Sequence, residues 1–157
     1  MRIIGIDPGT GILGFGVIDA DKDKFQLVDA GVIKTPPHTP LNDRLNEIFD
    51  GLNQIINETK PDVMSIEKLF FAQNTTTAMS VSHARGVAML VGQRNNLKIA
   101  EYTPLQIKQT ITGYGKADKK QVQEMVRIRL RLKKVPKPDD MADALAAAIT
   151  HSLMTRV

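Results

Sequence analysis

Four carboxylates in this sequence stand where an acidic side chain is unexpected. Asp7 and Glu67 each end an apolar run, and Asp140 and Asp143 open a run of Ala and other apolar residues. A buried charge is costly unless it is paired or bound to a metal. Carboxylate oxygens suit Mg²⁺ or Mn²⁺, and the chain has no Cys that would favour a softer metal. The set predicts a hard-cation site in which all four residues are metal ligands and catalytic groups.

The number of acids points to a particular chemistry. Four carboxylates match two divalent cations in charge, and such a pair, roughly 3.5–4 Å apart, can activate water and stabilise the leaving oxygen of a phosphodiester. Each acid alone has a plainer interpretation, and Asp140 could simply cap a helix. Asp7 is harder to explain in that way, because it lies between Ile6 and Pro8 at the end of an apolar strand.

Strand patterns position two of the acids. Apolar runs and alternating stretches predict strands over residues 2–7, 14–19, 25–35, 61–70 and 97–102. Short loops join the first three, which predicts an antiparallel meander. If the first and fourth strands are neighbours, Asp7 and Glu67 lie side by side. The glycines that follow Asp7 could also form a phosphate-binding loop, but they precede another strand, so a tight β-turn is favoured.

Helical patterns position the other two acids. Helices are predicted over residues 41–59, 75–93, 104–112, 118–132 and from 139 or 140 to 151. Residues 126–133 also alternate like a strand, but the apolar face that includes Val122 and Met125 favours a helix. Asp139 or Asp140 is expected to cap the last helix. Asp140 and Asp143 share a helix face and can lie over the strand pair. The element order predicts an α/β fold with a mixed five-stranded sheet and helices on both faces.

The composition is that of an ordinary globular protein. The chain has 157 residues, 42% apolar and 24% charged, which predicts one domain over residues 1–157. The formal charge is +4, and it is more positive outside the four acids, which suits a polyanionic partner. The absence of Cys excludes disulfides and thiolate chemistry. No apolar stretch is long enough to cross a membrane, and the N-terminus enters a strand at once, so a cytoplasmic location without a signal peptide is expected.

A set of short stretches occurs together in this chain and is specific as a set. The stretches are residues 4–10, 66–67, 84–88, 122–123, 125–127, 143–146 and 148–151. With them, the chain resembles the RuvC-type Holliday-junction resolvases, which have the RNase H-like fold of the retroviral-integrase superfamily. The resemblance covers nearly the full length. It implies that the catalytic tetrad is Asp7, Glu67, Asp140 and Asp143, with Asp139 as the alternative to Asp140.

The resemblance also implies an activity and partners. The expected function is a metal-dependent endonuclease that resolves four-way DNA junctions by paired, symmetric nicks during recombination and repair. The expected cofactor is two Mg²⁺ or Mn²⁺ ions per site. The expected partners are junction DNA, a second copy of the chain and a branch-migration motor of the RuvA/RuvB type.

Candidate DNA contacts flank the acids. The resemblance assigns Phe70 to stacking on unpaired bases at the junction and Lys108 and Lys119 to phosphates near the cut. Lys116 and Lys120 flank the same glycine-containing loop and complete the predicted set. The plainer interpretations are a core aromatic residue for Phe70 and a solvated basic face for the lysines.

A stripe of small residues on the second predicted helix suggests how two copies associate. Ala78, Ser82, Gly86 and Met89 form the stripe, with Met79 and Leu90 beside it. Packing of this helix on its own sheet is the alternative. A homodimer seam is favoured, because two cuts related by a twofold axis need two sites so related.

Other function classes fit less well. An ATPase of the actin and sugar-kinase type shares the sequence of residues 5–10, but it needs a second, similar domain, which a chain of 157 residues lacks. A non-catalytic junction-binding module leaves the four carboxylates unexplained. His38, His83 and His151 lack the spacing of a zinc site, and His151 is predicted to be structural.

Overall fold

The computed structural model describes residues 1–68 and 75–156. The elements in chain order are β1 (Arg2–Asp7), β2 (Ile12–Asp21), β3 (Lys24–Lys34), α1 (Leu41–Thr59), β4 (Val63–Glu67), α2 (Thr75–Arg94), β5 (Lys98–Tyr102), α3 (Pro104–Thr112), α4 (Lys119–Arg129) and α5 (Asp139–Met154). Within these residues, five strands form one sheet in the order β3-β2-β1-β4-β5. β1, β2 and β3 are antiparallel, whereas β4 runs parallel to β1 and β5 parallel to β4. The predicted mixed sheet with its meander is confirmed.

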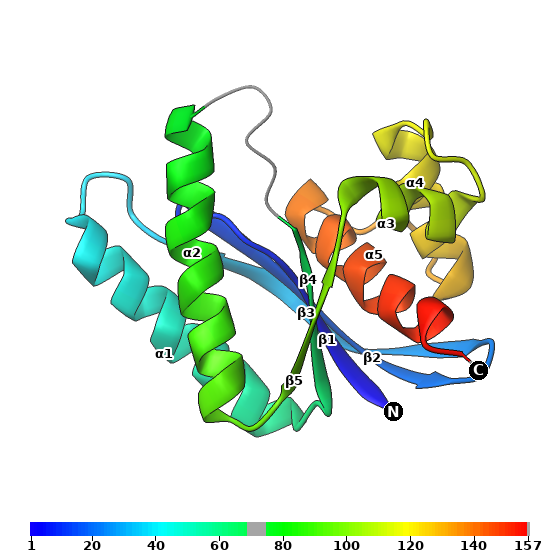
Figure 1. Cartoon of the computed structure of the whole chain (residues 1–157), viewed down its shortest axis with the longest axis horizontal. Coiled ribbons are helices and arrows are strands. Elements are labelled where there is room, and N and C mark those ends of the chain that lie inside the picture. Colours follow the sequence, from blue (N-terminus) through cyan, green and yellow to red (C-terminus); the bar gives the residue numbers. More distant parts are fainter. Residues whose placement is uncertain (69–74, 157) are drawn as a thin grey trace.

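Helices cover both faces of the sheet, as predicted (Figure 1). α1 and α2 pack on one face over a core that includes Ile4 and Ile6 of β1. α3, α4 and α5 lie on the other face, and their core includes Ile3. Because side chains alternate along a strand, the odd-numbered residues of β1 face α5, and Asp7 is one of them. None of the helices in the described part of the chain is long and apolar enough to cross a membrane.

Some predicted boundaries were wrong. β2 is longer than expected, and β4 is shorter, beginning at Val63 and ending at Glu67. α4 ends at Arg129 rather than near residue 132, because Leu130 is its C-cap and Arg131 has a left-handed φ of 54°. The alternating stretch after residue 126 therefore forms the end of a helix and an irregular connection.

The predicted cap of the last helix was also wrong. The N-cap of α5 is Pro138, in an extended conformation, and no side chain caps the helix. Asp139 and Asp140 both lie in the first turn, where the helix dipole favours negative charge. The helix also extends beyond the predicted end, to Met154. By contrast, side chains cap the two preceding helices: Thr103 caps α3 and Asp118 caps α4, each as part of a capping box.

Glycines allow α5 to approach the sheet closely. A Cβ atom at Gly5 would lie 1.9 Å from the Ala144 carbonyl oxygen, and one at Gly14 would lie 2.1 Å from the Asp140 carbonyl oxygen. On the neighbouring strand, Ser65 Oγ donates a hydrogen bond of 2.6 Å to the Ala147 carbonyl oxygen. The backbone of α5 therefore rests almost directly on β1, β2 and β4.

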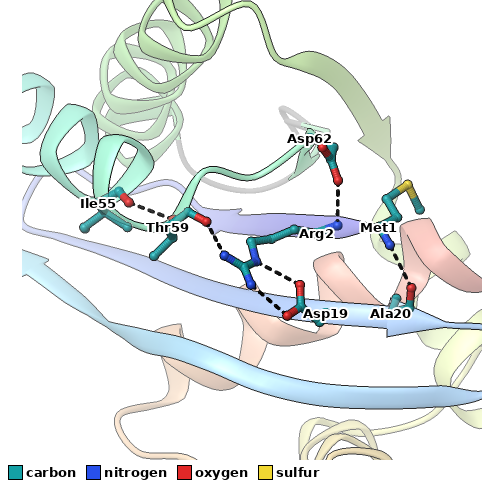
Figure 2. A network of polar contacts seen from close by, with 7 residues as sticks. All are labelled: Met1, Arg2, Asp19, Ala20, Ile55, Thr59 and Asp62. Carbon is teal, nitrogen blue, oxygen red and sulfur yellow. Dashed lines mark hydrogen bonds and ion pairs between the residues drawn. The ribbon is translucent and has the colours of Figure 1, made fainter.

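A polar network holds the opposite end of β1 from Asp7 (Figure 2). The Arg2 guanidinium donates to the Asp19 carboxylate through Nε and Nη2, both at 2.8 Å, and through Nη1 to the Thr59 carbonyl oxygen at 2.6 Å. The Arg2 backbone N–H donates to Asp62 Oδ2 at 2.8 Å. The network joins β1 to β2, to the end of α1 and to the turn before β4. Because the network is partly exposed, its ion pair is expected to add little to stability.

Candidate active site

Asp7 and Glu67 are neighbours at the same end of two parallel strands. In the register of β1 and β4, Ile6 is opposite Ile66, and Asp7 and Glu67 are the next residues on each strand. Gly5 and Ser65, two residues earlier, are likewise opposite each other and contact α5. The period of two along a strand therefore directs both carboxylates to the α5 side of the sheet. The prediction that Asp7 and Glu67 lie side by side is confirmed.

α5 brings Asp140 and Asp143 to the same place. Asp7 is opposite Gly14 in the antiparallel register of β1 and β2, and Gly14 lies under the Asp140 backbone. The Asp140 and Asp143 charges both act on Asp7, and the Asp143 charge acts also on Glu67. The structure thus gathers all four predicted acids at the carboxyl ends of β1 and β4, under the first turns of α5.

Burial and mutual repulsion make this group strongly electronegative. Burial, followed by the charges of Asp143, Asp140 and Glu67, raises the pKa of the Asp7 carboxyl to about 8. Burial also raises the pKa of Glu67, and the Asp143 charge raises it further, while Lys108 and Lys119 oppose the shift. The pKa of Asp143 is raised by burial against the opposing effect of Lys119. A nearby cation would strongly stabilise the charged form of such carboxylates.

The donor set fits hard divalent cations, but the side chains do not yet converge on one point. Within residues 1–68 and 75–156, no group of three or more His, Asp or Glu side chains is arranged to hold a metal ion. The Lys119 ammonium lies 3.3 Å from Asp143 Oδ2. Their chemistry and burial suit Mg²⁺ or Mn²⁺, and binding would require side-chain rotation.

Asp139 and Asp140 have different surroundings. Asp139 accepts a hydrogen bond from Gln123 Nε2 at 3.0 Å and pairs with Lys119 Nζ at 3.4 Å. The hydrogen bond and then the Lys119 charge lower the pKa of the Asp139 carboxyl. The Asp140 charge instead acts on Asp7. Asp139 is therefore engaged by α4, whereas Asp140 belongs to the group of acids.

A pocket of about 310 Å³ opens beside the acids. Glu67, Asp143, Lys108 and Lys119 line it, together with residues of α3, α4 and α5. Two predicted phosphate contacts therefore face the acids. Lys116 and Lys120 are exposed, and Lys120 lines a neighbouring hollow of about 440 Å³ instead. A larger hollow of about 780 Å³, beside the β2–β3 hairpin, contains none of the predicted site residues.

Comparison with known proteins identifies the family. The model of the family "Crossover junction endodeoxyribonuclease RuvC" matches residues 3–151. The chain belongs to the RuvC family. It is 53% identical over 152 residues to RuvC of Alkaliphilus metalliredigens, covering 97% of this chain and 93% of that relative. It is 52% identical over 151 residues to RuvC of Fusobacterium nucleatum, covering 96% of this chain and 80% of the relative.

A solved RuvC structure has the same fold. Thermus thermophilus RuvC, determined in complex with a Holliday junction substrate, matches with a TM-score of 0.95 and 34% identity. The match covers 99% of this chain and 95% of the Thermus chain. The predicted RNase H-like class of fold is therefore confirmed for this RuvC family member.

The predicted dimer stripe on α2 needs correction. Ala78 is buried, with 6% exposure, and Met89 packs partly against the core under α1 and α2. The outward face carries Met79, His83, Gly86 and Leu90, all exposed at helical spacing. Of the predicted stripe, Gly86 lies on this face and Ser82 is half-buried. The error has a physical cause: small residues pack as well against the chain's own sheet as against a partner.

Other predicted residues have different outcomes. Phe70 lies outside the described residues. His151 is buried, and its Nδ1 lies 2.7 Å from the Tyr102 hydroxyl, as suits a structural role. Burial lowers the pKa of this imidazole. Arg85, which is not among the predicted site residues, donates from Nε to the Glu67 carbonyl oxygen at 3.2 Å. It stands in one of the family stretches, but sequence spacing cannot reveal that contact.

Replacing Asp7 by Asn should stabilise the protein in EDTA, and increasingly so as the pH rises from about 5 to 8.5. The Asp7 carboxyl has a pKa of about 8 in the folded chain against an ordinary value of 3.8. Between these values the unfolded chain has released the proton that the folded chain still holds, so stability falls as the pH rises. Thermal melts of both proteins at several pH values measure the difference between their melting temperatures. Asp50→Asn is the control, because it removes an exposed carboxylate of α1. If the melting temperatures of Asp7→Asn and the unmodified protein differ by the same amount at every pH, the expectation is contradicted.

Proposed function

We propose that the group of acids Asp7, Glu67, Asp140 and Asp143, with the pocket beside it, is where this RuvC family member cuts DNA. The chain is a crossover junction endodeoxyribonuclease that resolves Holliday junctions by hydrolysing phosphodiester bonds. The observation that supports the assignment of the site is the grouping of four carboxylates beside a pocket that Lys108 and Lys119 line. Acids alone would repel a phosphate, and lysines alone would bind it without cutting.

The four carboxylates would hold two divalent cations, with Asp140 rather than Asp139 as the fourth ligand. The cations would supply Lewis acidity and charge stabilisation at the scissile phosphate. Asp7 is central, because it contacts Asp140 and is influenced by the other two acids. Lys119 holds Asp143 and Asp139 from the α4 side, which fixes the first turn of α5. Lys108 and Lys119 would orient the phosphate in the pocket.

A labelled four-way junction tests this function directly. The protein should produce paired nicks, in strands of like polarity, only when Mg²⁺ or Mn²⁺ is added. A linear duplex with the sequence of one junction arm is the matched control and should remain uncut. Binding without cutting under all metal conditions would favour the non-catalytic junction-binding alternative.

Lys108→Ala and Lys119→Ala should each weaken junction binding or cleavage. Each loss of a phosphate contact should reduce the slope of log K against log salt by about one unit. Lys24→Ala is the matched control, because Lys24 lies at the β2–β3 hairpin, at the far end of the sheet from Asp7. Binding titrations at several salt concentrations measure the slope. Unchanged slopes and unchanged cleavage would show that these lysines form an ordinary solvated face.

We also propose that two copies associate through the outward face of α2, which carries Met79, His83, Gly86 and Leu90. Met79 and Leu90 are 62% and 53% exposed, which is unusual for large apolar residues. Twofold association would give two sites for two cuts. The branch-migration motor of the RuvA/RuvB type, the cytoplasmic location and the single-domain extent over residues 1–157 stay predictions.

Gly86→Glu should produce monomers that lose paired nicking. A Cβ atom at Gly86 meets nothing within 4 Å, so the chain itself can accommodate the new side chain. The added charge would be buried in a dimer seam without a partner. Sedimentation with and without junction measures association. Asn57→Glu is the control, because Asn57 is an exposed residue of α1. A monomeric unmodified protein under both conditions would contradict the dimer proposal.

A further inference from the structure

Hydrogen bonds tie α2 to the ends of the strands that carry Asp7 and Glu67. Arg85 Nε donates to the Glu67 carbonyl oxygen at 3.2 Å. Thr10, three residues after Asp7, donates from Oγ1 to the Ser80 carbonyl oxygen at 2.6 Å. Thr10 is only 4% exposed, so its hydroxyl bond is shielded from water. The helix that offers its outer face to a partner therefore holds the two catalytic strands from the other side.

The Arg85 guanidinium spans three elements. Besides the Glu67 carbonyl oxygen on β4, it forms an ion pair with the Glu101 carboxylate on β5. Its Nη1 contacts Met89 Sδ, one turn further along α2, at 3.4 Å. The side chain is 17% exposed, so it is largely enclosed. A planar guanidinium with several donors is suited to such simultaneous contacts, and Lys is not.

The β4–β5 ladder ends at the position where Arg85 acts. The Lys68 N–H donates to the Tyr102 carbonyl oxygen at 2.7 Å. The next N–H of the β5 chain, that of Thr103, donates to Gln106 Oε1 at 2.8 Å as part of the α3 capping box. The chain turns away from β4 at this point to begin α3. Because the C=O and N–H of one trans peptide point in opposite directions, the Glu67 carbonyl points away from β5, and Arg85 provides it with a donor from α2.

We propose that Arg85 is a positioning residue for DNA cleavage, which fixes the backbone of Glu67 and couples it to the α2 face beside Gly86. This inference rests on the proposed function of the acidic pocket. Arg85 acts through Glu67 and does not touch the phosphate. Its loss should therefore reduce turnover and raise the Mg²⁺ requirement, while junction affinity stays nearly unchanged.

Arg85→Met tests this inference, with Arg94→Met as the matched control, because Arg94 is an exposed arginine at the end of the same helix. Single-turnover cleavage by Arg85→Met should fall by at least about 20-fold, since a displacement near 1 Å can cost about 100-fold. The half-saturating Mg²⁺ concentration should rise several-fold, whereas the junction Kd, measured with Ca²⁺, should change by less than about threefold. Arg85→Lys should restore part of the rate, because one ammonium can reach one of the acceptors.

Amide hydrogen exchange provides a readout that does not depend on cleavage. In Arg85→Met, the Lys68 amide should exchange faster than in the unmodified chain, while the amides of β1 and β2 keep their protection. Cleavage within about twofold of the unmodified rate at unchanged Mg²⁺ dependence would overturn the inference. So would a parallel loss of affinity with a salt slope lowered by about one unit, which would make Arg85 a phosphate contact. If the unmodified protein does not cut, the proposed function fails, and unchanged Lys68 exchange would separately overturn the positioning role.

Discussion

Asp7→Asn, Glu67→Gln and Asp143→Asn are each expected to abolish junction cleavage and to leave junction binding at or above the level of the unmodified chain. Each substitution removes a carboxylate that we propose as a metal ligand while keeping the shape of the side chain. Binding should not suffer, because the lost charge repels phosphate and Lys108 and Lys119 remain in the pocket. Single-turnover cleavage and binding in Ca²⁺ separate the two effects. The expected loss in rate exceeds about 1,000-fold, or about 4 kcal/mol of transition-state stabilisation.

The pair Asp139→Asn and Asp140→Asn provides the control within the same turn of α5. Asp140→Asn should behave like the other three, because Asp140 lies close enough for its charge to act on Asp7. Asp139→Asn should retain most of the activity, because Asp139 is engaged by Gln123 and Lys119. Any one of the four that still cuts within about tenfold of the unmodified rate is not a required ligand, since that loss is only about 1.4 kcal/mol.

The sequence predicted well which acids lie together, because the signal was chemical. A carboxylate at the end of an apolar strand is expensive to bury, so Asp7 and Glu67 stood out without any knowledge of their contacts. Their convergence followed from topology: β1 and β4 are parallel neighbours in the register that places the two residues side by side. The helical spacing of Asp140 and Asp143 then supplied the other half of the site.

The sequence predicted less where several partners can satisfy the same pattern. A stripe of small residues on α2 packs equally well inward or outward, and Ala78 faces the core. α4 ends where the backbone of Arg131 adopts a left-handed conformation. Gly often marks such a helix end in a sequence, but Arg does not. The choice between Asp139 and Asp140 depended on α4, since Gln123 engages the former. These features are set by tertiary contacts rather than by local preference.

Gly14→Ala is expected to misplace α5 and with it Asp140. A Cβ atom at Gly14 would lie 2.1 Å from the Asp140 carbonyl oxygen and 2.5 Å from its carbonyl carbon. Both are backbone atoms of a helix, so no side-chain rotation relieves the clash, and α5 must shift. Overpacking of this kind costs about 1–3 kcal/mol, and more where the neighbour cannot give way.

The activity of Gly14→Ala should fall further than its stability explains. At a temperature where the variant is still fully folded by circular dichroism, cleavage should drop by about 100-fold, because the acids on α5 and on the strands no longer share the same geometry. Gly11→Ala is the matched control in the adjoining turn, since its Cβ would meet only the end of the Arg44 side chain, at 3.4 Å. It should melt and cut like the unmodified chain. If Gly14→Ala is folded and cuts within a few-fold of the unmodified rate, then close contact between α5 and β2 does not set the position of Asp140, and its pairing with Asp7 must be maintained by the carboxylates themselves.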